Sequence, residues 1–189
     1  MRKLSVFDTV SLDGYFTDAN NDMSWAHSNN DDTEWNAFVQ GNASAGSSVL
    51  VYGRVTYEMM ASFWPTPIAA QQMPVVATQM NSLPKIVFSN SLKAATWANT
   101  TLIKGDAVKE MHRLKNEAGD NMTILGSGKL VASFTQAGLI DSYQLVVKPI
   151  VLGGGRTIFE GVSDKPSLKH ISSRTFKNGN VVLNYQAIP

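Results

Sequence analysis

The segment MTILGSGKLVAS, residues 122–133, combines an apolar strand-like run, a glycine turn and the start of a helix. Glycines let a backbone approach a phosphate closely, and the N–H groups at a helix N-terminus point toward such an anion. The glycine spacing fits the dinucleotide-binding pattern G-x-G-x-x-A. A true Rossmann fold is disfavoured, because the next strand ends in KPIVLG without the expected acidic residue. These residues alone leave two interpretations open, a phosphate site and a plain left-handed turn.

Strand-like runs of the same kind recur on both sides of this segment. They cover residues 3–10, 48–52, 85–89, 100–104, 122–125, 143–151, 168–176 and 181–188. Most are near-continuous β-branched or aromatic runs, which are typical of strands buried on both faces of a sheet. Asn178-Gly179 separates the last two runs and predicts a hairpin, because both residues tolerate positive φ.

Helical patterns fall between these runs. Asp31 and Glu34 have the spacing of a capping box, while Asp106 can cap a later helix that Gly119 would stop. The second helix is expected to stop at Trp64-Pro65, and the fourth to run from about Lys129 to Ala137. Each helix is expected to turn a set of apolar residues toward the core. These residues are Trp35, Phe38 and Val39 in the first helix; Val55, Met59, Met60 and Phe63 in the second; Val108, Met111, Leu114 and Ala118 in the third; and Leu130, Val131 and Phe134 in the fourth. The Pro-, Gln- and Ala-rich residues 65–84 are interpreted as an irregular crossing segment. Strand-helix alternation predicts one α/β domain over residues 1–189, with a mostly parallel sheet, an antiparallel C-terminal hairpin and helices on both faces.

Composition narrows the function classes. Lys+Arg 16 against Asp+Glu 15 gives a net charge of +1, which argues against a nucleic-acid or anionic-membrane binder. The absence of cysteine excludes disulfides, thiolate chemistry and Cys-ligated zinc. The histidines at 27, 112 and 170 are isolated, so no metal site is expected. No targeting signal and no apolar run long enough to span a bilayer is visible, and a cytoplasmic protein is expected.

Two further motifs are compatible with ligand binding. In LVYGRVTYEMM, residues 50–60, a strand ends at Gly53, and Arg54 and Thr56 open a helix. An Arg fork with a hydroxyl at a helix N-terminus suits a phosphate monoester, although taken alone an Arg54–Glu58 surface pair is favoured. The glycines at 153–155 permit either a close approach to a ligand or a wide turn between strands.

Taken in order, these pieces resemble the dihydrofolate-reductase-like superfamily. The resemblance rests on SLDGYF (11–16), GRVTYE (53–58), KIVFSNSL (85–92), ILGSGKL (124–130), GLIDSYQLVVKPIVLGGG (138–155) and RTIFEG (156–161), and it covers nearly the whole chain. The most similar branch is the reductase domain of bacterial bifunctional riboflavin-biosynthesis deaminase-reductases. The Cys and His motifs of the deaminase half are absent, so a stand-alone reductase domain is expected.

The resemblance implies a sheet of about eight strands and NADPH as hydride donor. Carried over residue by residue, it assigns Gly53, Arg54 and Thr56 to the adenosine 2′-phosphate end, Ser89, Asn90 and Ser91 to the adenine ribose, Gly126, Ser127, Gly128, Lys129 and Leu130 to the pyrophosphate, and Val10, Asp13 and Gly14 to the neighbourhood of the nicotinamide. The pair Gly126-Ser127 departs from the paired glycines of dihydrofolate reductases. The resemblance moves the interpretation of the glycine turn toward cofactor binding.

The resemblance implies the substrate-binding residues less specifically than the cofactor-binding residues. Asp32 is similar in position to the acidic residue that binds the pterin in dihydrofolate reductases, and a raised pKa would let it donate a proton. Phe7, Trp35 and Trp64 are candidate pocket walls. Three hypotheses follow: an NADPH-dependent reductase of a pterin or an aminopyrimidine, resembling 5-amino-6-(5-phosphoribosylamino)uracil reductase; an NADPH-binding module without turnover; and a protein whose glycine turns are structural only. A homodimer is expected from the family, with the strand 143–151, beginning at Tyr143, as a possible interface.

Overall fold

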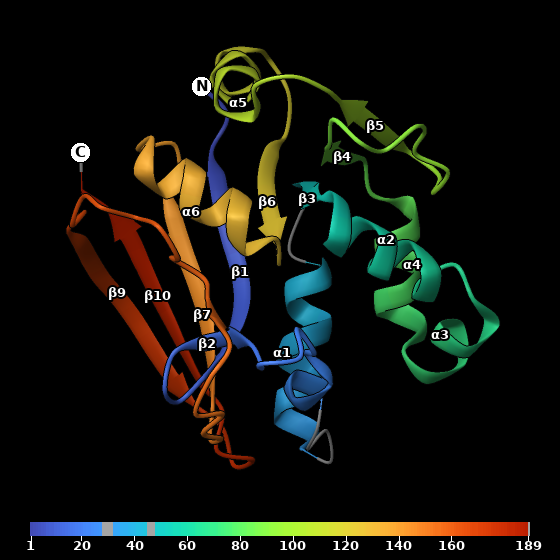
Figure 1. Ribbon diagram of the computed structural model, residues 1–189. Helices are drawn as coiled ribbons and strands as arrows, with labels where there is room; N and C mark the ends of the chain where they lie inside the picture. The colour runs from blue at the N-terminus through green and yellow to red at the C-terminus, as the bar shows by residue number, and fades with distance from the viewer. Residues whose placement is uncertain (28–31, 45–47, 189) are drawn as a thin grey trace.

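A computed structural model describes residues 1–27, 32–44 and 48–188 of the chain (Figure 1). Its central sheet is formed by β1 (Leu4–Ser11), β3 (Ser48–Gly53), β4 (Lys85–Phe88), β5 (Thr100–Ile103), β6 (Asn121–Leu125), β7 (Ser142–Lys148), β9 (Leu168–Thr175) and β10 (Val181–Ala187). Among the described residues, the sheet has eight strands in the order β5-β4-β3-β6-β1-β7-β10-β9. The pairs β7–β10 and β10–β9 are antiparallel and the other neighbours are parallel. The expected sheet and terminal hairpin are confirmed.

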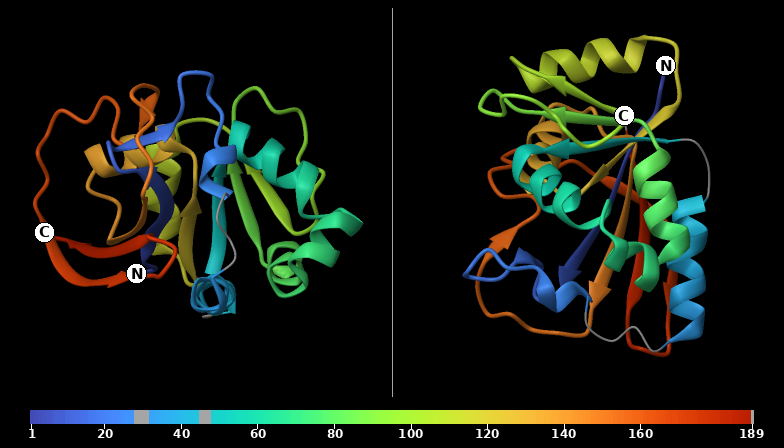
Figure 2. Two further views of the ribbon diagram at one scale, coloured as in Figure 1. Left: turned by 90° about the horizontal axis from the view of Figure 1, so that it is seen from below. Right: turned by 90° about the vertical axis from the view of Figure 1, so that its right-hand side faces the viewer.

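Helices cover both faces of this sheet, as expected. They are α1 (Thr33–Ser44), α2 (Arg54–Phe63), α3 (Pro67–Gln72), α4 (Pro74–Ser82), α5 (Ala107–Asn116) and α6 (Gly128–Gln136), with a 3-10 turn η1 (Ser24–His27). Met111 of α5 and Phe134 of α6 share one apolar cluster with Val6 and Ile124 of the sheet. On the opposite face, α2 and α4 pack on β3 and β4, and α1 packs on β7 and β10. Figure 2 shows α1 and α4 side by side on that second face.

A small second sheet joins β2 (Tyr15–Thr17) to β8 (Arg156–Thr157), and the sequence patterns did not predict it. Gly155 makes this pairing possible. Its φ is +137°, and a Cβ at this position would lie 1.9 Å from the Thr17 carbonyl oxygen. Only glycine tolerates both conditions, so the triple-glycine segment is required by the fold at this position.

The prediction of an irregular segment over residues 65–84 is wrong, because α3 and α4 occupy most of it. The Thr66 hydroxyl accepts a hydrogen bond from the Ala69 N–H, and Pro67 and Pro74 occupy the first turns of the two helices. Proline is tolerated there because the first N–H groups of a helix have no intrahelical partner. The prolines therefore start helices in this segment instead of interrupting them.

The predicted core-facing stripe of α2 is also wrong for most of its residues. Val55, Met59 and Phe63 are exposed, whereas Thr56 and Tyr57 are buried against the sheet. Tertiary packing thus selected a neighbouring face of the helix, on which Met60 also packs. In the third predicted helix, Asp106 is the N-cap as expected, but α5 ends at Asn116 and Ala118 is exposed. The predicted cap residue Asp31 lies outside the described residues.

The predicted dimer interface on residues 143–151 includes most of β7, and it stays a prediction. β7 lies between β1 and β10 in the sheet, and Tyr143 is buried, with its hydroxyl hydrogen-bonded to that of Thr135. Tyr143 is therefore part of the core.

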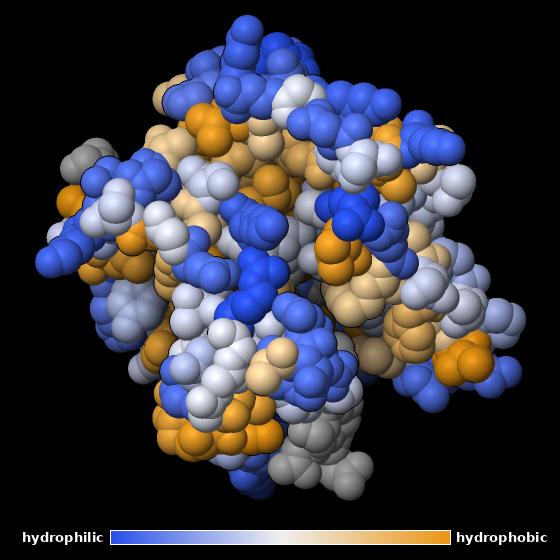
Figure 3. Space-filling model, in the orientation of Figure 1, coloured by the Kyte–Doolittle hydropathy of each residue, from blue (hydrophilic) through white to orange (hydrophobic). Residues whose placement is uncertain are grey.

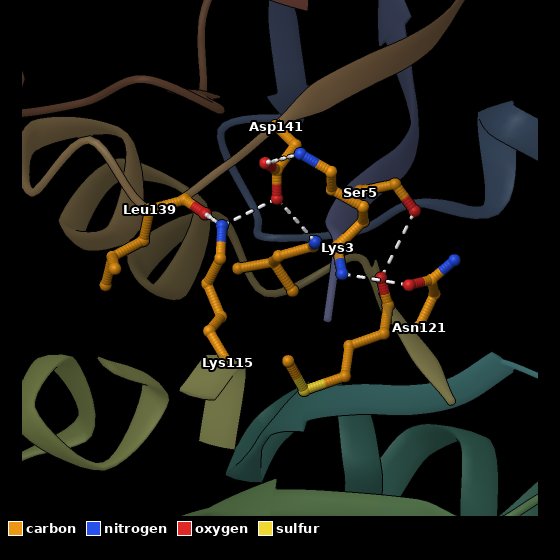
Figure 4. Close-up of polar contacts among 8 residues, drawn as sticks. Lys3, Ser5, Lys115, Asn121, Leu139 and Asp141 are labelled. Carbon is orange, nitrogen blue, oxygen red and sulfur yellow. Dashed lines mark hydrogen bonds and ion pairs between the residues drawn. The ribbon is translucent and has the colours of Figure 1, made fainter. Parts of the chain in front are cut away.

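At the amino end of the sheet, Asp141 holds three elements together (Figure 4). Its carboxylate accepts hydrogen bonds from the Leu4 N–H of β1 at 2.8 Å and from Lys115 of α5 at 2.6 Å. Lys3 adds a more exposed contact at 3.1 Å. These charge-assisted bonds fix the start of β1 and of β7 against α5.

No helix in the described part of the chain has the length and apolar character of a membrane span.

Candidate functional site

The sheet order brings several of the sequence motifs to one edge. β4, β3, β6 and β1 are consecutive neighbours and run parallel, so their carboxyl ends lie side by side. The segments that follow these ends begin at Ser89, Arg54, Gly126 and Leu12, respectively. In open α/β sheets, ligands bind at this edge.

The glycine turn and the start of α2 form one unit. The Gly53 N–H donates a 2.7 Å hydrogen bond to the Ser127 hydroxyl. A Cβ on Gly126 would lie 2.9 Å from Thr56 Cγ2, and Gly126 itself has φ +63°. Ser127 is also left-handed, with φ +67°. The structure therefore brings Gly53, Thr56, Gly126 and Ser127 together.

The N-terminus of α6 opens from this turn without a side-chain cap. The first N–H groups of a helix lack intrahelical partners and carry the positive end of its dipole. Phe16 packs beside the turn, with its ring 3.4 Å from the place of a Cβ on Gly128. An apolar wall and unpartnered donors at one turn are suited to hold an anionic group that approaches the backbone.

An open pocket lies next to this helix start, lined by Gly128, Lys129, Arg156 and Glu160. In the view of Figure 3, strongly hydrophilic side chains gather near the middle of the face turned toward the reader. Arg156 Nε is 3.1 Å from Glu160 Oε2. Sequence reasoning assigned no role to Arg156 or Glu160. The motif RTIFEG contained the signal, because Arg156 and Glu160 have helical i, i+4 spacing directly after the glycines.

Arg54 does not point freely toward this site. Its guanidinium donates to Glu58 Oε2 at 2.6 Å, and both side chains are a little under half exposed. This is the surface pair that the sequence favoured when the motif was taken alone. Exposed i, i+4 pairs contribute only about 0.3–0.5 kcal/mol, so a phosphate could replace Glu58 as the partner.

Ser89, Asn90 and Ser91 form a fixed turn after β4. The Ser89 hydroxyl accepts from the N–H groups of Ser91 and Leu92, at 3.2 Å and 2.9 Å. Asn90 bonds to both backbone groups of Gly105, with its oxygen 2.6 Å from the Gly105 N–H. The side chain of Asn90 thus joins the loops that follow β4 and β5.

Asp13 joins the loop after β1 to the glycine-rich loop. Its carboxylate accepts from the Ser11 hydroxyl at 2.6 Å and from the N–H groups of Leu152 and Gly153. The Ser11 hydrogen bond, followed by those from the backbone, lowers the pKa of Asp13 to about 2. Val10 is buried at the end of β1, and Gly14 has φ +87° in the turn. This loop, expected near the nicotinamide, is therefore held rigidly.

Asp32 is the helix cap of α1 and an anchor for the β9–β10 hairpin. One oxygen accepts from the N–H groups of Glu34 and Trp35, and the other accepts from Asn178 N–H at 3.0 Å. Desolvation favours a higher pKa, but these backbone hydrogen bonds and the charge of Lys177 outweigh it and lower the pKa of Asp32. The raised pKa that a proton donor needs is not found.

The three aromatic candidates are not brought together. Phe7 and Trp35 share the cluster under α1, where the Trp35 ring meets Phe176 edge-on at 5.1 Å. Trp64 packs in the cluster under α2 and α4, and its indole N–H donates to Met60 Sδ. Trp35 is buried, so its main contribution is to the core.

A model of the RibD C-terminal domain matches residues 2–182. The chain belongs to this family. A protein of Shewanella sp. PV-4 assigned to riboflavin biosynthesis has a crystal structure with 27% sequence identity and a TM-score of 0.74, with 99% of each chain covered. As a RibD C-terminal domain, the chain thus belongs to a family of reductases.

Two more distant structures share the fold. The Thermotoga maritima deaminase/5-amino-6-(5-phosphoribosylamino)uracil reductase is 16% identical with a TM-score of 0.66, and the match covers 99% of this chain and 57% of that one. Dihydrofolate reductase from Enterococcus faecalis, complexed with NADP(H), is 12% identical with a TM-score of 0.63, over 99% and 97% of the two chains. The RibD-type domain is therefore dihydrofolate-reductase-like in fold, as the resemblance implied.

Proposed function

We propose that this RibD-type domain is an NADPH-dependent reductase of a heterocyclic substrate of the aminopyrimidine or pterin type. The observation that carries the proposal is the glycine turn, because Gly126 packs on Thr56, and Ser127 bonds to Gly53 at the uncapped start of α6. Membership of the RibD C-terminal domain family favours an aminopyrimidine such as 5-amino-6-(5-phosphoribosylamino)uracil. A dihydrofolate or pterin reductase is the alternative.

The residues present fit a dinucleotide phosphate. A side chain at position 126 would strike Thr56, so glycine lets the turn pack closely on the start of α2. Lys129 and Arg156 line the adjoining pocket and supply positive charge. Arg54 lies at the start of α2, where exchange of Glu58 for a ligand phosphate would let it hold the 2′-phosphate end.

When bound, NADPH would supply a hydride to a C=N or C=O carbon of the substrate. The protein would contribute chiefly by positioning the cofactor and the substrate. The loop that Asp13 holds by hydrogen bonds would fix the end of β1, and the turn at 126–128 would fix the phosphates. Asp32 is ionised at neutral pH because its pKa is lowered, so we assign the proton to water. Asp32 would then orient the substrate and hold α1.

Turnover tests this proposal directly. NADPH oxidation would be followed with dihydrofolate and with the deaminated ribosylaminopyrimidine phosphate offered separately. Oxidation with the pyrimidine supports the riboflavin-type activity, and oxidation with dihydrofolate alone supports the alternative. NADPH binding without oxidation of either would support a binding module and contradict a reductase of these substrates.

The affinity for NADPH tests the proposed phosphate site separately from turnover. Lys129→Ala should weaken NADPH binding by about tenfold, which corresponds to the roughly 1.4 kcal/mol expected for one charge-assisted phosphate contact. Lys109→Ala removes another exposed lysine, from α5 and outside the pocket lining, and should leave affinity unchanged. Equal affinities in the two variants would contradict the placement of the phosphates at α6.

A further inference from the structure

The pocket beside the start of α6 contains an anion of its own. Lys129 and Arg156 line it with two positive charges, and Glu160 lines it with one negative charge. The two cations favour the binding of phosphate groups, whereas a carboxylate in the same lining repels them. Glu160 therefore opposes the phosphate binding proposed for this pocket.

The backbone fixes this acidic residue close to Arg156. Ile158 is buried, and its Cα lies 3.8 Å from the place of a Cβ on Gly128, so this segment packs on the start of α6. The chain then turns, and the Glu160 N–H donates to the Thr157 carbonyl at 3.4 Å. This turn holds the Glu160 carboxylate within reach of the arginine four residues earlier.

The carboxylate engages only part of the Arg156 guanidinium. The Arg156 Nε donates to Glu160 Oε2 at 3.1 Å, and the guanidinium has no other partner within the part of the chain that the structure describes. A guanidinium has five N–H donors, so four remain for a ligand. Lys129 has no ion-pair or hydrogen-bond partner among the described residues.

The pair is weak enough to be exchanged for a phosphate. The side chains of Arg156 and Glu160 are 41% and 61% exposed, and water screens ion pairs that are this exposed. A phosphate group has more acceptor oxygens than a carboxylate and can accept from Arg156 and Lys129 together. The same arrangement occurs at the start of α2, where Arg54 donates to Glu58, again four residues on.

We propose that Glu160 is a resident counter-anion of Arg156 that an incoming phosphate group displaces. The inference rests on the proposed function for its ligand and adds a specificity-determining residue to that site. Displacement of Glu160 lowers the affinity of every anion that uses Arg156 by the same factor. A dinucleotide has further contacts with the protein and stays bound, whereas a free inorganic anion lacks them. Glu160 thus keeps free phosphates out of the pocket.

Binding of inorganic pyrophosphate, measured by isothermal titration calorimetry at fixed ionic strength, tests this inference without turnover. Glu160→Gln keeps the size of the side chain and removes its charge, so Arg156 loses its anionic partner. The variant should bind pyrophosphate about threefold more tightly than the wild type, or better, because no exposed ion pair has to be broken. Equal affinities in the two proteins would overturn the inference.

Glu117→Gln provides the matched control, because it removes the same charge from the same kind of pair. Glu117 pairs with Arg113 four residues earlier in the chain, and neither residue lines the pocket. The pyrophosphate affinity of this variant should equal that of the wild type. A gain as large as that of Glu160→Gln would show an effect of net charge alone, which contradicts displacement at Arg156.

A double-mutant cycle with Arg156→Ala separates displacement from simple repulsion. If Glu160 acts by occupying Arg156, the gain from Glu160→Gln should disappear when Arg156 is absent. If Glu160 only repels the ligand, the gain should be the same with and without Arg156. The second result would overturn the inference, because no exchange of partners would then take place.

The outcomes separate this inference from the proposed activity. Pyrophosphate binding that strengthens in Glu160→Gln only when Arg156 is present, in a protein that does not oxidise NADPH, supports the inference and contradicts the reductase proposal. Turnover of NADPH, with the same pyrophosphate affinity in the wild type and in Glu160→Gln, overturns the inference alone. An absence of pyrophosphate binding to Glu160→Gln also overturns it.

Discussion

At the scale of single residues, two aspartates behave oppositely for physical reasons that the sequence does not display. Asp32 is partly buried and surrounded by N–H donors, which lower its pKa. Asp8 lies inside β1 with 4% of its surface exposed, and its Oδ2 has no partner. Burial raises the pKa of Asp8 to about 8, despite a hydrogen bond from the Thr9 N–H. Asp8 is therefore largely protonated at neutral pH in the folded protein.

Asp8→Asn should remove a pH dependence of stability. Between about pH 4 and pH 8 the unfolded chain has released the Asp8 proton and the folded chain has kept it. The free energy of unfolding should therefore fall as pH rises through this window, by up to about 1.4 kcal/mol per pH unit. Urea denaturation at several pH values measures the slope. If the wild type and Asp8→Asn have the same slope, Asp8 is not the titrating group.

Asp32 should act through position and not through proton transfer. Asp32→Ala should cost about 1 kcal/mol, because the N-cap of α1 is lost, whereas Asn is itself a good N-cap and should cost less. In Asp32→Asn, turnover should fall while the shape of its pH profile is retained. The loss of an acidic limb from the profile would show that Asp32 titrates during the reaction.

At the scale of elements, the sequence predicted three features least well: the role of the prolines, the role of the glycines and which face of a helix is buried. Pro67 and Pro74 look like interruptions in sequence, yet each opens a helix. The stripe of apolar residues on α2 has correct helical spacing, yet Tyr57 on another face is the residue buried beside Trp97. Local sequence patterns predict that a helix forms, but packing against the neighbouring strands decides which face of that helix is buried.

Gly155→Ala should be severely destabilising, and Gly154→Ala provides its control. A Cβ on Gly155 would lie 1.9 Å from the Thr17 carbonyl oxygen at φ +137°, whereas a Cβ on Gly154 meets nothing within 4 Å. We expect Gly155→Ala to cost about 3 kcal/mol or more and Gly154→Ala less than about 1 kcal/mol. Thermal unfolding measures both. Similar melting temperatures would mean that β2 and β8 can separate without cost.

At the scale of the whole molecule, the Asp141 ion pairs and the proposed ligand site lie at opposite ends of the sheet. Asp141 clamps β1 and α5 at the amino end, and the glycine turn lies at the carboxyl end. The expected homodimer stays a prediction, which sedimentation velocity can measure.

Asp141→Asn should lower stability without changing NADPH affinity. Replacing the carboxylate weakens its bonds to Leu4 N–H and Lys115 and should cost about 1–2 kcal/mol, since Asp141 is partly exposed. Lys3→Ala, which removes the contact whose lysine is 68% exposed, should cost less than about 0.5 kcal/mol. Urea denaturation and NADPH titration measure the two quantities. A large loss of affinity in Asp141→Asn would contradict the separation of the two ends.

The sequence by itself determined the α/β class, the strands, the terminal hairpin and the glycine turn, because these depend on short-range periodicity and on conformations that few residues adopt. The resemblance of ordered motifs determined the family. Only the tertiary structure decided that Gly53, Thr56 and Gly126 touch, and that Arg156 and Lys129 share a pocket with Glu160. These properties depend on strand order and register, which bring together residues far apart in the chain and set the solvent exposure that fixes pKa values and hydrogen-bond partners.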